Sequence, residues 1–447
     1  MLQCILMTQP LVVPRAEHTL SRKQIDSDAL RVLYRLHESD YLAYLVGGSV
    51  RDLLLGHRPK DFDIGTSAHP YQVKKLFRNC WIIGRRFRLA HIRFGPKMFE
   101  VATFRRQVSA EEHAALAAKP PQHDVPGDAP PGTGHDRVVH RDNTFGTPEE
   151  DAFRRDFTVN ALFYDIGSFS IIDYTGGLRD LKARIIRCIG EPAERFQEDP
   201  VRMLRAMVMA ARLDFSVDPP IDEAIAVHRG AIAKSAPARL IEEFYKILRS
   251  GASERTFRLL AGRRLLGPIA PELQRGCGDT LWRSLAALDA YRTQFDAPPD
   301  SLTNAVLLGS LVVPLGVGPG SIIGASAPRG ARNTEPAPSL GMLPLARRDV
   351  ERLRQILGLQ RRLIDRNAPP RARAALTHRG SFQEALTWLD IHGAAPDILA
   401  HWRASIEAVD SPETTPNRAG DPPTKRRRRR RRRRPTGNVP PGPKGDP

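Results

Sequence analysis

The stretch "YLVGGSVRDLLLGHRPKDFDIGT", residues 44–66, contains two adjacent glycines, an arginine and two aspartates separated by one residue. Apolar residues in "YLAYLVGG" predict a strand that enters a glycine turn, and "SVRDLLLG" predicts a short helix closed by Gly56. "KDFDIGT" alternates in the way a strand does. We therefore expect a strand, a glycine turn, a helix and a second strand, in that order.

Two carboxylates lie in the second predicted strand. Asp61 and Asp63 would face the same side of the sheet, because residues two apart in a strand do so. Such a pair is repulsive unless a cation lies between the two groups, and hard oxygen ligands suit Mg²⁺. The pair could form half of a two-metal phosphoryl-transfer centre. A D-x-D pair is also common in surface turns, so only the surrounding residues can distinguish a metal-binding pair from an ordinary turn.

The residues around the pair favour phosphate chemistry. Gly47 and Gly48 lie between a strand and a helix, where backbone N–H groups can bind phosphate oxygens, and Arg51 follows one turn later. A third carboxylate is expected, and there are two candidates. Glu100, in "MFEVATF", would lie on a neighbouring strand, whereas Asp156 lies in "RRDFTVN". Either could instead be an ordinary salt-bridged surface acid.

A second cluster of charge lies in "GEPAERFQEDPVRMLRAM". Glu198 and Asp199 are expected at a helix start, with Pro200 at the first helical position. Arg202 and Arg205 would share a helix face with Asp199, and such a face offers a nucleobase edge both an acceptor and donors. Helix capping alone also explains the two acids.

Patterning along the chain predicts an α+β protein. The expected segments are an N-terminal extension over residues 1–24, a head with a small mixed sheet over 25–180, a helical region over 181–270, a second helical region over 271–410 and a disordered tail over 411–447. Segments 107–140 and 314–343 are rich in Pro and Gly and are expected to be a mobile loop and an irregular insertion.

Three local predictions concern the head. "HIRFG" with "MFEVATF" is expected to form one hairpin, and "FSIIDYTGGLRDL" another. Tyr44, Phe62 and Trp81 are expected to be core residues.

The formal charge of +18 predicts a polyanionic partner. Ten of the basic residues form one run, Lys425–Arg434, and the rest of the chain is still basic. The run has no interleaved aromatic residues, so it is expected to hold the RNA backbone without reading sequence. The RNA-binding residues assigned there are Lys425, Arg426, Arg427, Arg428, Arg429 and Arg430.

A cytoplasmic location is expected. The four cysteines are scattered without a CxxC pair, which suits a reducing compartment. Pro10 and Pro14 interrupt the apolar start, which argues against a signal peptide. The most apolar internal run begins at Ala305, contains Pro314 and is shorter than a bilayer span, so no membrane segment is predicted.

Four motifs occur in an order that is typical of one family. They are "LVGGSVRDLLLG" with "KDFDIGT", "RRDFTVNALFYD", "YTGGLRDL" and "EDPVRMLRA". In these motifs the chain resembles the class II nucleotidyltransferases, which comprise bacterial poly(A) polymerases and tRNA CCA-adding enzymes. The resemblance extends from about His18 to about Leu213. "LFRNCWIIGRRFRLAHIRFG" and the Arg-rich extension are similar to the poly(A) polymerase branch.

The resemblance implies a role for each matching position. Asp61 and Asp63 would bind the catalytic metal ions, Asp156 would be a further acid associated with activity, and Glu100 would be a supporting neighbour. Contacts to the nucleotide would come from Gly47, Gly48, Arg51, Arg154, Arg155 and Asn160. The base would be read by Asp199, Arg202 and Arg205.

The expected activity is template-independent addition of AMP from ATP to RNA 3′ ends, with release of pyrophosphate and with two Mg²⁺ ions. CCA addition to tRNA is a close alternative. A basic RNA-binding protein with a relic transferase head is an alternative of another class. Partners in RNA decay cannot be derived from the sequence.

Overall fold

The computed structural model describes residues 9–84, 88–106, 145–316, 339–365, 367–393 and 396–410. Contacts divide the chain into two units, Met1–Pro396 and Asp397–Pro447. The Arg-rich run, all of segment 107–140 and much of segment 314–343 lie outside the described residues, so the expectations about them stay predictions. Within the described part of the chain, no helix is both long and apolar enough to span a membrane.

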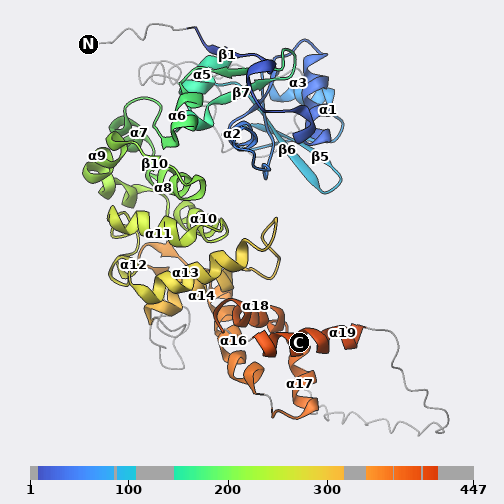
Figure 1. Cartoon of the computed structure of the whole chain (residues 1–447), viewed down its shortest axis with the longest axis vertical. Helices are drawn as coiled ribbons and strands as arrows, with labels where there is room; N and C mark the ends of the chain where they lie inside the picture. Colours follow the sequence, from blue (N-terminus) through green and yellow to red (C-terminus); the bar gives the residue numbers. More distant parts are fainter. Residues whose placement is uncertain are drawn as a thin grey trace, which may run out of the picture. The chain divides into compact units, whose positions relative to one another are not determined.

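The N-terminal part of the first unit contains an eight-stranded mixed sheet (Figure 1). In spatial order its strands are β1 Leu11–Val13, β8 Ile171–Asp173, β7 Leu162–Asp165, β2 Ala43–Val46, β3 Asp63–Thr66, β6 Lys97–Thr103, β5 Leu89–Phe94 and β4 Cys80–Ile83. Neighbouring strands are antiparallel, except that β3 and β6 are parallel. Strand β1 comes from the stretch expected to be an extension and pairs with β8.

Short helices accompany the sheet, and side-chain caps mark the beginning of α1 and α5. They are α1 Ser27–His37, α2 Gly48–Leu54, α3 Pro70–Leu76, α5 Pro148–Phe153 and α6 Gly177–Ala183. The Asp26 carboxylate accepts a hydrogen bond from the backbone N–H of Asp28 at 2.9 Å and so caps α1. Thr147 and Glu150 form a capping box at α5, with Pro148 in the first turn.

One hairpin prediction is confirmed and the other is wrong. Strands β5 and β6 form the expected antiparallel hairpin. "FSIIDYTGGLRDL" does not form a hairpin by itself, because its first half is β8 and its second half is α6. The Asp173 carboxylate accepts backbone hydrogen bonds from Gly176 and Gly177, and Gly176 has a φ of 81°. This Asx-type turn leads the chain into a helix, and β8 pairs with β7 instead.

Aromatic rings form one part of the core of the head. The Tyr44 and Phe104 rings lie 5.8 Å apart, and Phe163 lies 6.1 Å from Tyr44. Tyr44 is therefore buried as expected, whereas Phe62 is only partly buried. The expectation for Trp81 is wrong, because 54% of it is exposed. Strand β4 alternates, so its Cys80 side chain points inward and Trp81 points outward.

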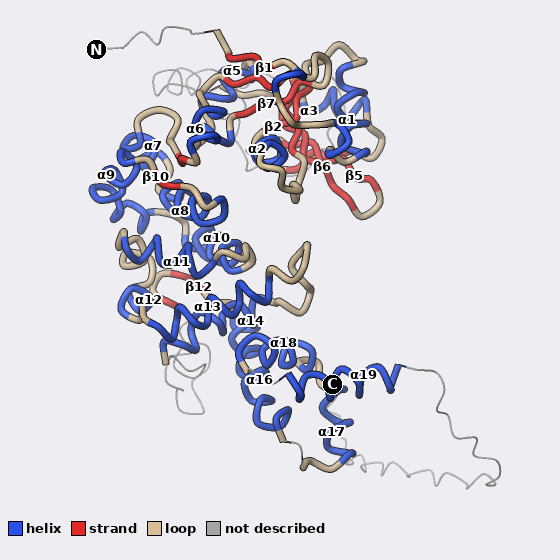
Figure 2. The backbone as a smooth tube through the Cα atoms, in the orientation of Figure 1, coloured by secondary structure: helices blue, strands red, loops and turns tan. Residues whose placement is uncertain are grey.

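The chain beyond the sheet is helical, as predicted (Figure 2). Its helices are α7 Pro192–Glu198, α8 Val201–Leu213, α9 Pro219–His228, α10 Pro237–Leu248, α11 Ser253–Gly262, α12 Pro271–Arg275, α13 Asp279–Arg292, α14 Asn304–Val312, α16 Arg347–Ile364, α17 Pro370–Thr377 and α18 Phe382–His392, and the second unit contains most of α19, Pro396–Asp410. Helix α8 packs against α11, α11 against α13, and α14 against α16. Two small sheets pair β9 Ile185–Ile186 with β10 Ser216–Val217 and β11 Ser339–Leu340 with β12 Leu343–Pro344.

Candidate nucleotidyltransferase site

Asp63 and Glu100 lie on adjacent strands at the middle of the sheet. Ile64 on β3 pairs with Val101 on β6, so the residues just before them, Asp63 and Glu100, are also neighbours. Burial, followed by the negative charges of Glu100 and Asp61, raises the pKa of Asp63 to about 6, and Arg155 opposes this rise. The three carboxylates therefore lie in one region of negative potential.

Asp61 does not lie on the strand as predicted. Strand β3 begins at Asp63, which pairs with Val46, the last residue of β2. The chain turns away immediately after Val46, where Gly47 donates its N–H to the carbonyl of Leu162 at 3.1 Å. Residues before Asp63 therefore have no β2 partner. The Asp61 side chain is 72% exposed, with the Lys60 ammonium 3.9 Å away.

The donor chemistry at this position fits a hard divalent cation. Carboxylate oxygens are the ligands that Mg²⁺ prefers, and a cation would relieve the repulsion that raises the pKa of Asp63. Among the described residues, no three acidic, histidine or cysteine side chains are gathered into a complete ligand set. Asp61, Asp63 and Glu100 thus match Mg²⁺ in kind, and substrate or water oxygens would have to complete its coordination.

The glycine turn lies close to an arginine from a distant part of the chain. Gly47 has a φ of 71°, in the left-handed region that favours glycine, and α2 begins at the next residue. A Cβ atom at Gly47 would lie 3.1 Å from the Nη1 atom of Arg155. That guanidinium also donates from Nη1 to the carbonyl of Asn160 at 3.3 Å. Arg155 is therefore placed against the turn and within the electrostatic reach of Asp63.

Arg51 is held rather than free. It is buried, and its guanidinium donates to the Asp52 carboxylate at 2.6 and 2.8 Å and to Oδ1 of Asn160 at 2.5 Å. Its Nη2 atom would lie 3.4 Å from a Cβ atom at Gly48. The sequence elements "GGSVR" and "RRDFTVN" therefore meet in the structure, as their joint assignment to the nucleotide requires.

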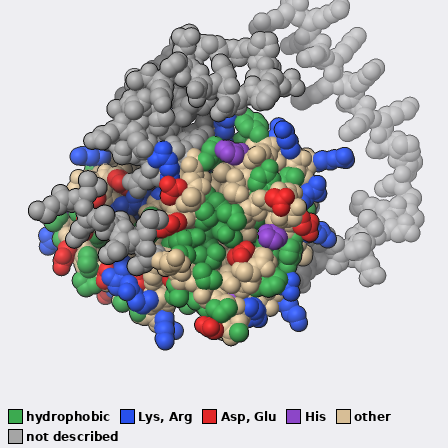
Figure 3. Space-filling view, turned by 90° about the horizontal axis from the view of Figure 1, so that it is seen from above, with side chains coloured by type: hydrophobic (Ala, Val, Ile, Leu, Met, Phe, Trp, Pro, Cys, Tyr) green, Lys and Arg blue, Asp and Glu red, His purple; other side chains and the backbone are tan. Residues whose placement is uncertain are grey.

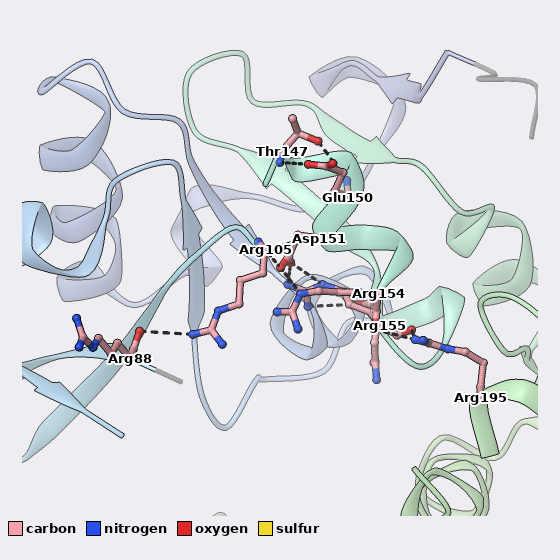
Figure 4. A network of polar contacts seen from close by, with 9 residues as sticks. Arg88, Arg105, Thr147, Glu150, Asp151, Arg154, Arg155 and Arg195 are labelled. Carbon is pink, nitrogen blue, oxygen red and sulfur yellow. Dashed lines mark hydrogen bonds and ion pairs between the residues drawn. The ribbon is translucent and has the colours of Figure 1, made fainter. Parts of the chain in front are cut away.

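A buried acid that the sequence reasoning missed organises the arginines (Figure 4). Asp151 on α5 accepts hydrogen bonds from Arg154 at 2.8 Å and from Arg155 at 2.8 and 3.2 Å. Burial alone would raise the pKa of Asp151, but the two guanidinium groups outweigh it and lower the pKa. Nη2 of Arg195 on α7 donates to the carbonyls of Arg154 and Arg155 at 2.7 and 2.6 Å.

The contacts of Asp151 could have been predicted from the spacing of charged residues in the sequence. Asp151 precedes Arg154 by three residues and Arg155 by four, which is the spacing of side-chain pairs on a helix. The reach of Arg195 across some forty residues had no comparable signal in the sequence.

Asp156 and Glu100, the two candidates for a third carboxylate, lie in different surroundings. Asp156 is buried, its Oδ1 accepts the N–H of Phe157 at 3.0 Å, and its Oδ2 lies 2.7 Å from Nη2 of Arg205. Glu100 instead influences Asp63 directly. In the described structure Asp156 thus joins the head to α8 through Arg205.

The second predicted cluster lies at a junction between two helices. Glu198 ends α7, Asp199 follows it, Pro200 is the N-cap of α8, and Val201 begins that helix. The expectation that Glu198 lies at a helix start with Pro200 at the first helical position is wrong, because α7 already includes Glu198. Asp199 still accepts the N–H of Val201 at 3.2 Å.

The three predicted base-reading residues have separate protein partners. Arg239 on α10 donates to both oxygens of Asp199 at 2.9 and 2.7 Å. Arg202 donates to Glu198 at 2.8 Å, and Arg205 pairs with Asp156. Their guanidinium and carboxylate groups are therefore oriented before any ligand binds.

A cavity of about 480 Å³ opens beside Asp199. It is lined by residues 197–200 together with Ala231, Lys234, Ser235 and Arg239. Arg239 was not singled out in the sequence, because it lies forty residues from Asp199 and no local pattern connects them.

Comparison with known proteins accounts for this combination of head and helical body. The poly(A) polymerase head domain matches residues 43–187, the probable RNA- and SrmB-binding site of polymerase A matches 214–277, and the polymerase A arginine-rich C-terminus matches 337–435. The chain belongs to the poly(A) polymerase family. Its recognition from four sequence motifs is thereby confirmed.

Curated relatives come from both branches of this nucleotidyltransferase group. The chain is 46% identical over 273 residues to poly(A) polymerase I of Escherichia coli O157:H7, a match that covers 61% of this chain and 56% of that protein. It is 34% identical over 258 residues to the CCA-adding enzyme of Lactobacillus helveticus, covering 55% of this chain and 59% of that protein. The chain thus spans little more than half the length of the curated relatives it matches.

Solved structures give the same fold. The Bacillus stearothermophilus CCA-adding enzyme in complex with CTP has a TM-score of 0.59 at 26% identity, covering 85% of this chain and 82% of that one. The Thermotoga maritima CCA-adding enzyme complexed with tRNA has a TM-score of 0.51 at 18% identity, covering 92% and 88%. The second likeness concerns the fold alone.

Proposed function

We propose that this protein is a template-independent polymerase that transfers AMP from ATP to the 3′-hydroxyl of RNA and releases pyrophosphate. The observation that carries the proposal is that Asp63 and Glu100 are neighbours on adjacent strands, with Asp61 two residues before Asp63, while Arg155 and Arg51 lie close to the glycine turn. These residues lie within the segment that matches a poly(A) polymerase head. The 46% identity to a poly(A) polymerase I favours ATP as the nucleotide.

Asp61 and Asp63, supported by Glu100, would hold Mg²⁺. Bound Mg²⁺ would neutralise charge that develops on the phosphates and lower the pKa of the RNA 3′-hydroxyl, so no separate general base is required. The protein's own contribution is a region of negative potential that retains cations at this position.

The arginines and glycines would hold the nucleotide. Gly47 and Gly48 allow the Arg155 and Arg51 guanidinium groups to lie close to the turn, where these groups would bind phosphate oxygens. Asn160 is fixed by Arg51 and would contact the nucleotide. Planar guanidinium groups suit phosphate because they can donate two hydrogen bonds at once.

Base selection would depend on Asp199, Arg202 and Arg205. Each is fixed by an ion pair or a charge-assisted hydrogen bond to another side chain. A fixed donor and acceptor pattern discriminates bases because the wrong base leaves buried polar groups unpaired. In this arrangement Asp156 acts through Arg205 and is a positioning residue.

RNA is the proposed second substrate, and RNA processing or decay is the proposed context. Basic side chains project from the described surface in the view of Figure 3, and a matched region is described as a probable RNA-binding site. Lys425–Arg430 would add sequence-independent affinity. Cys80, Cys188 and Cys277 are free thiols, which agrees with a cytoplasmic location.

CCA addition to tRNA is the second candidate, favoured by the fold shared with a CCA-adding enzyme in complex with CTP. The test is to incubate the full chain with Mg²⁺, each single nucleotide or CTP plus ATP, and either oligo(A) or tRNA that lacks its CCA end. We expect extension of oligo(A) with ATP alone. Extension confined to tRNA with CTP and ATP would reverse the ranking, and RNA binding without extension would favour a non-catalytic RNA-binding protein.

A further inference from the structure

A row of outward-facing side chains crosses the sheet from its edge to the candidate site. Trp81 on β4 pairs with His91 on β5, and His91 pairs with Glu100 on β6. Nε2 of His91 lies 3.8 Å from Oε1 of Glu100. Since Glu100 adjoins Asp63 on β3, the four residues occupy one face in consecutive strands. Strands lie about 4.8 Å apart, so the row from Trp81 to Asp63 spans roughly 14 Å.

The outer part of this row is apolar and accessible to solvent. Trp81 is 54% exposed, Ile83 49% and Met98 55%. Sδ of Met98 lies 2.8 Å from Nδ1 of His91, so the methionine lies beside the row. Clustered exposed apolar side chains on a sheet face typically mark a binding surface. We call Trp81, Ile83, His91 and Met98 the edge platform.

The chemistry of the edge platform suits nucleobases. An indole face stacks on any base, whichever its sequence, and such stacking is the usual way in which proteins hold single-stranded RNA. Basic groups accompany it, because Arg93 is exposed on β5 and Lys60 is 82% exposed beside Asp61. A span of roughly 14 Å corresponds to about four stacked nucleotides at roughly 3.4 Å each.

We propose that the edge platform binds the 3′-terminal nucleotides of single-stranded RNA, with a base stacked on Trp81 and the strand leading past His91 and Glu100 to Asp63. The proposal rests on the proposed function, because it identifies the platform as the approach of the RNA end to the transfer site. Continuity with that site and the excess of positive charge favour RNA over a protein partner or a second copy of this chain.

The test compares three variants of the full chain: Trp81→Ala, Trp81→Phe and Leu11→Ala. Leu11, on β1 at the opposite edge of the sheet, is 56% exposed and serves as a control for loss of an exposed apolar side chain. The first measurement is quenching of tryptophan fluorescence by oligo(A) without ATP. The second is the KM for oligo(A), compared with the KM for ATP.

We expect Trp81→Ala to lose most of the quenching and to raise the KM for oligo(A) about tenfold, while the KM for ATP stays at the wild-type value. Trp81→Phe should keep an oligo(A) KM near that of the wild type, because phenylalanine still stacks. Leu11→Ala should match the wild type in both measurements.

An unchanged KM for oligo(A) and undiminished quenching in Trp81→Ala would overturn the proposal. So would a wild-type dimer in sedimentation that Trp81→Ala converts to a monomer, because the platform would then be a protein interface. The fluorescence measurement needs no catalysis, so it tests the platform even if the wild-type chain extends no RNA. Failure of the proposed function is thereby distinguished from failure of the platform.

Discussion

Glu100 on β6 adjoins Asp63 on β3, and its charge, after burial, is the largest influence that raises the pKa of Asp63 to about 6. A fold gains nothing from holding like charges together, so such a cluster indicates a function that uses the negative potential. This relationship gives the first prediction.

Glu100→Gln should weaken AMP transfer ten- to a hundredfold, because the cation would lose a supporting carboxylate. In a chelator without metal, the same variant should have a higher midpoint of thermal unfolding than the wild type, because repulsion of Asp63 is relieved. Glu38→Gln, an exposed acid that follows α1, is the control. Equal activity of Glu100→Gln and the control would show that Glu100 takes no part.

Gly47 and Gly56 offer a matched pair of substitutions. Both have positive φ angles, 71° and 76°, so alanine at either position should cost about 1 kcal/mol of unfolding free energy. A Cβ atom at Gly47 would have Arg155 within 4 Å, whereas a Cβ atom at Gly56 would meet no atom in that range. We expect Gly47→Ala to raise the KM for ATP, because the new methyl group displaces Arg155, and we expect Gly56→Ala to leave this KM unchanged. Equal KM values in the two variants would exclude the glycine turn from nucleotide binding.

Asp151→Asn should lower the unfolding free energy by about 3 kcal/mol, because it leaves two partly buried guanidinium groups without their carboxylate. Denaturant titration measures the effect. Asp28→Asn removes one partner of the Asp28–Arg31 pair, whose arginine is 71% exposed, and should cost less than about 1 kcal/mol. If both variants lose a similar amount of unfolding free energy, the buried network around Asp151 contributes no more to stability than an exposed ion pair does.

Arg239→Ala should reduce the preference for ATP over CTP, because it releases the Asp199 carboxylate from a two-point contact. The expected loss is about tenfold in the ratio of kcat/KM values. Arg263→Ala breaks a similar contact to Asp222 on α9 and serves as the control. If both variants keep the wild-type preference, Asp199 does not depend on Arg239.

His392 predicts a pH dependence of stability. Burial lowers its pKa to about 4, and its Nε2 lies 2.9 Å from Oγ of Ser310. In the unfolded chain His392 becomes protonated below about pH 6.5, whereas in the folded chain it becomes protonated only below about pH 4. The unfolding free energy should therefore fall as the pH is lowered through this window, by up to about 3 kcal/mol from this residue.

His392→Gln should flatten the part of the pH profile that His392 causes. Chemical unfolding of wild type and variant at pH 7 and pH 4.5 measures the difference. A difference between the two proteins that is the same at both pH values would show that the imidazole does not titrate on unfolding.

Much of the fold could be predicted from the sequence because its signals are local. Local patterns placed the helix that corresponds to α2, with Gly56 just beyond its end, and the helical part of the chain beyond residue 181. The end of β2 could not be predicted locally. It depends on the pairing of Val46 with Asp63, and that pairing decides that Asp61 lies before the strand.

The sequence predicted several residues of the candidate site, but it did not predict the long-range contacts that hold them. Asp63 and Glu100 were assigned to neighbouring strands, which the structure confirms. The partners Arg195 and Arg239 reach across about forty residues, so no spacing rule could reveal them. Trp81 was assigned to the core from its residue type, which contains no information on which side of β4 is covered.

The central claim is that Asp61 and Asp63 perform nucleotidyl transfer together with a divalent ion. The most direct measurement follows incorporation of labelled ATP into an oligo(A) primer by the wild type and by the Asp61→Asn/Asp63→Asn variant, both with Mg²⁺. We predict that the wild type extends the primer, that the variant is slower by at least about a thousandfold, and that both bind the primer equally. A variant that extends the primer at the wild-type rate would contradict the account.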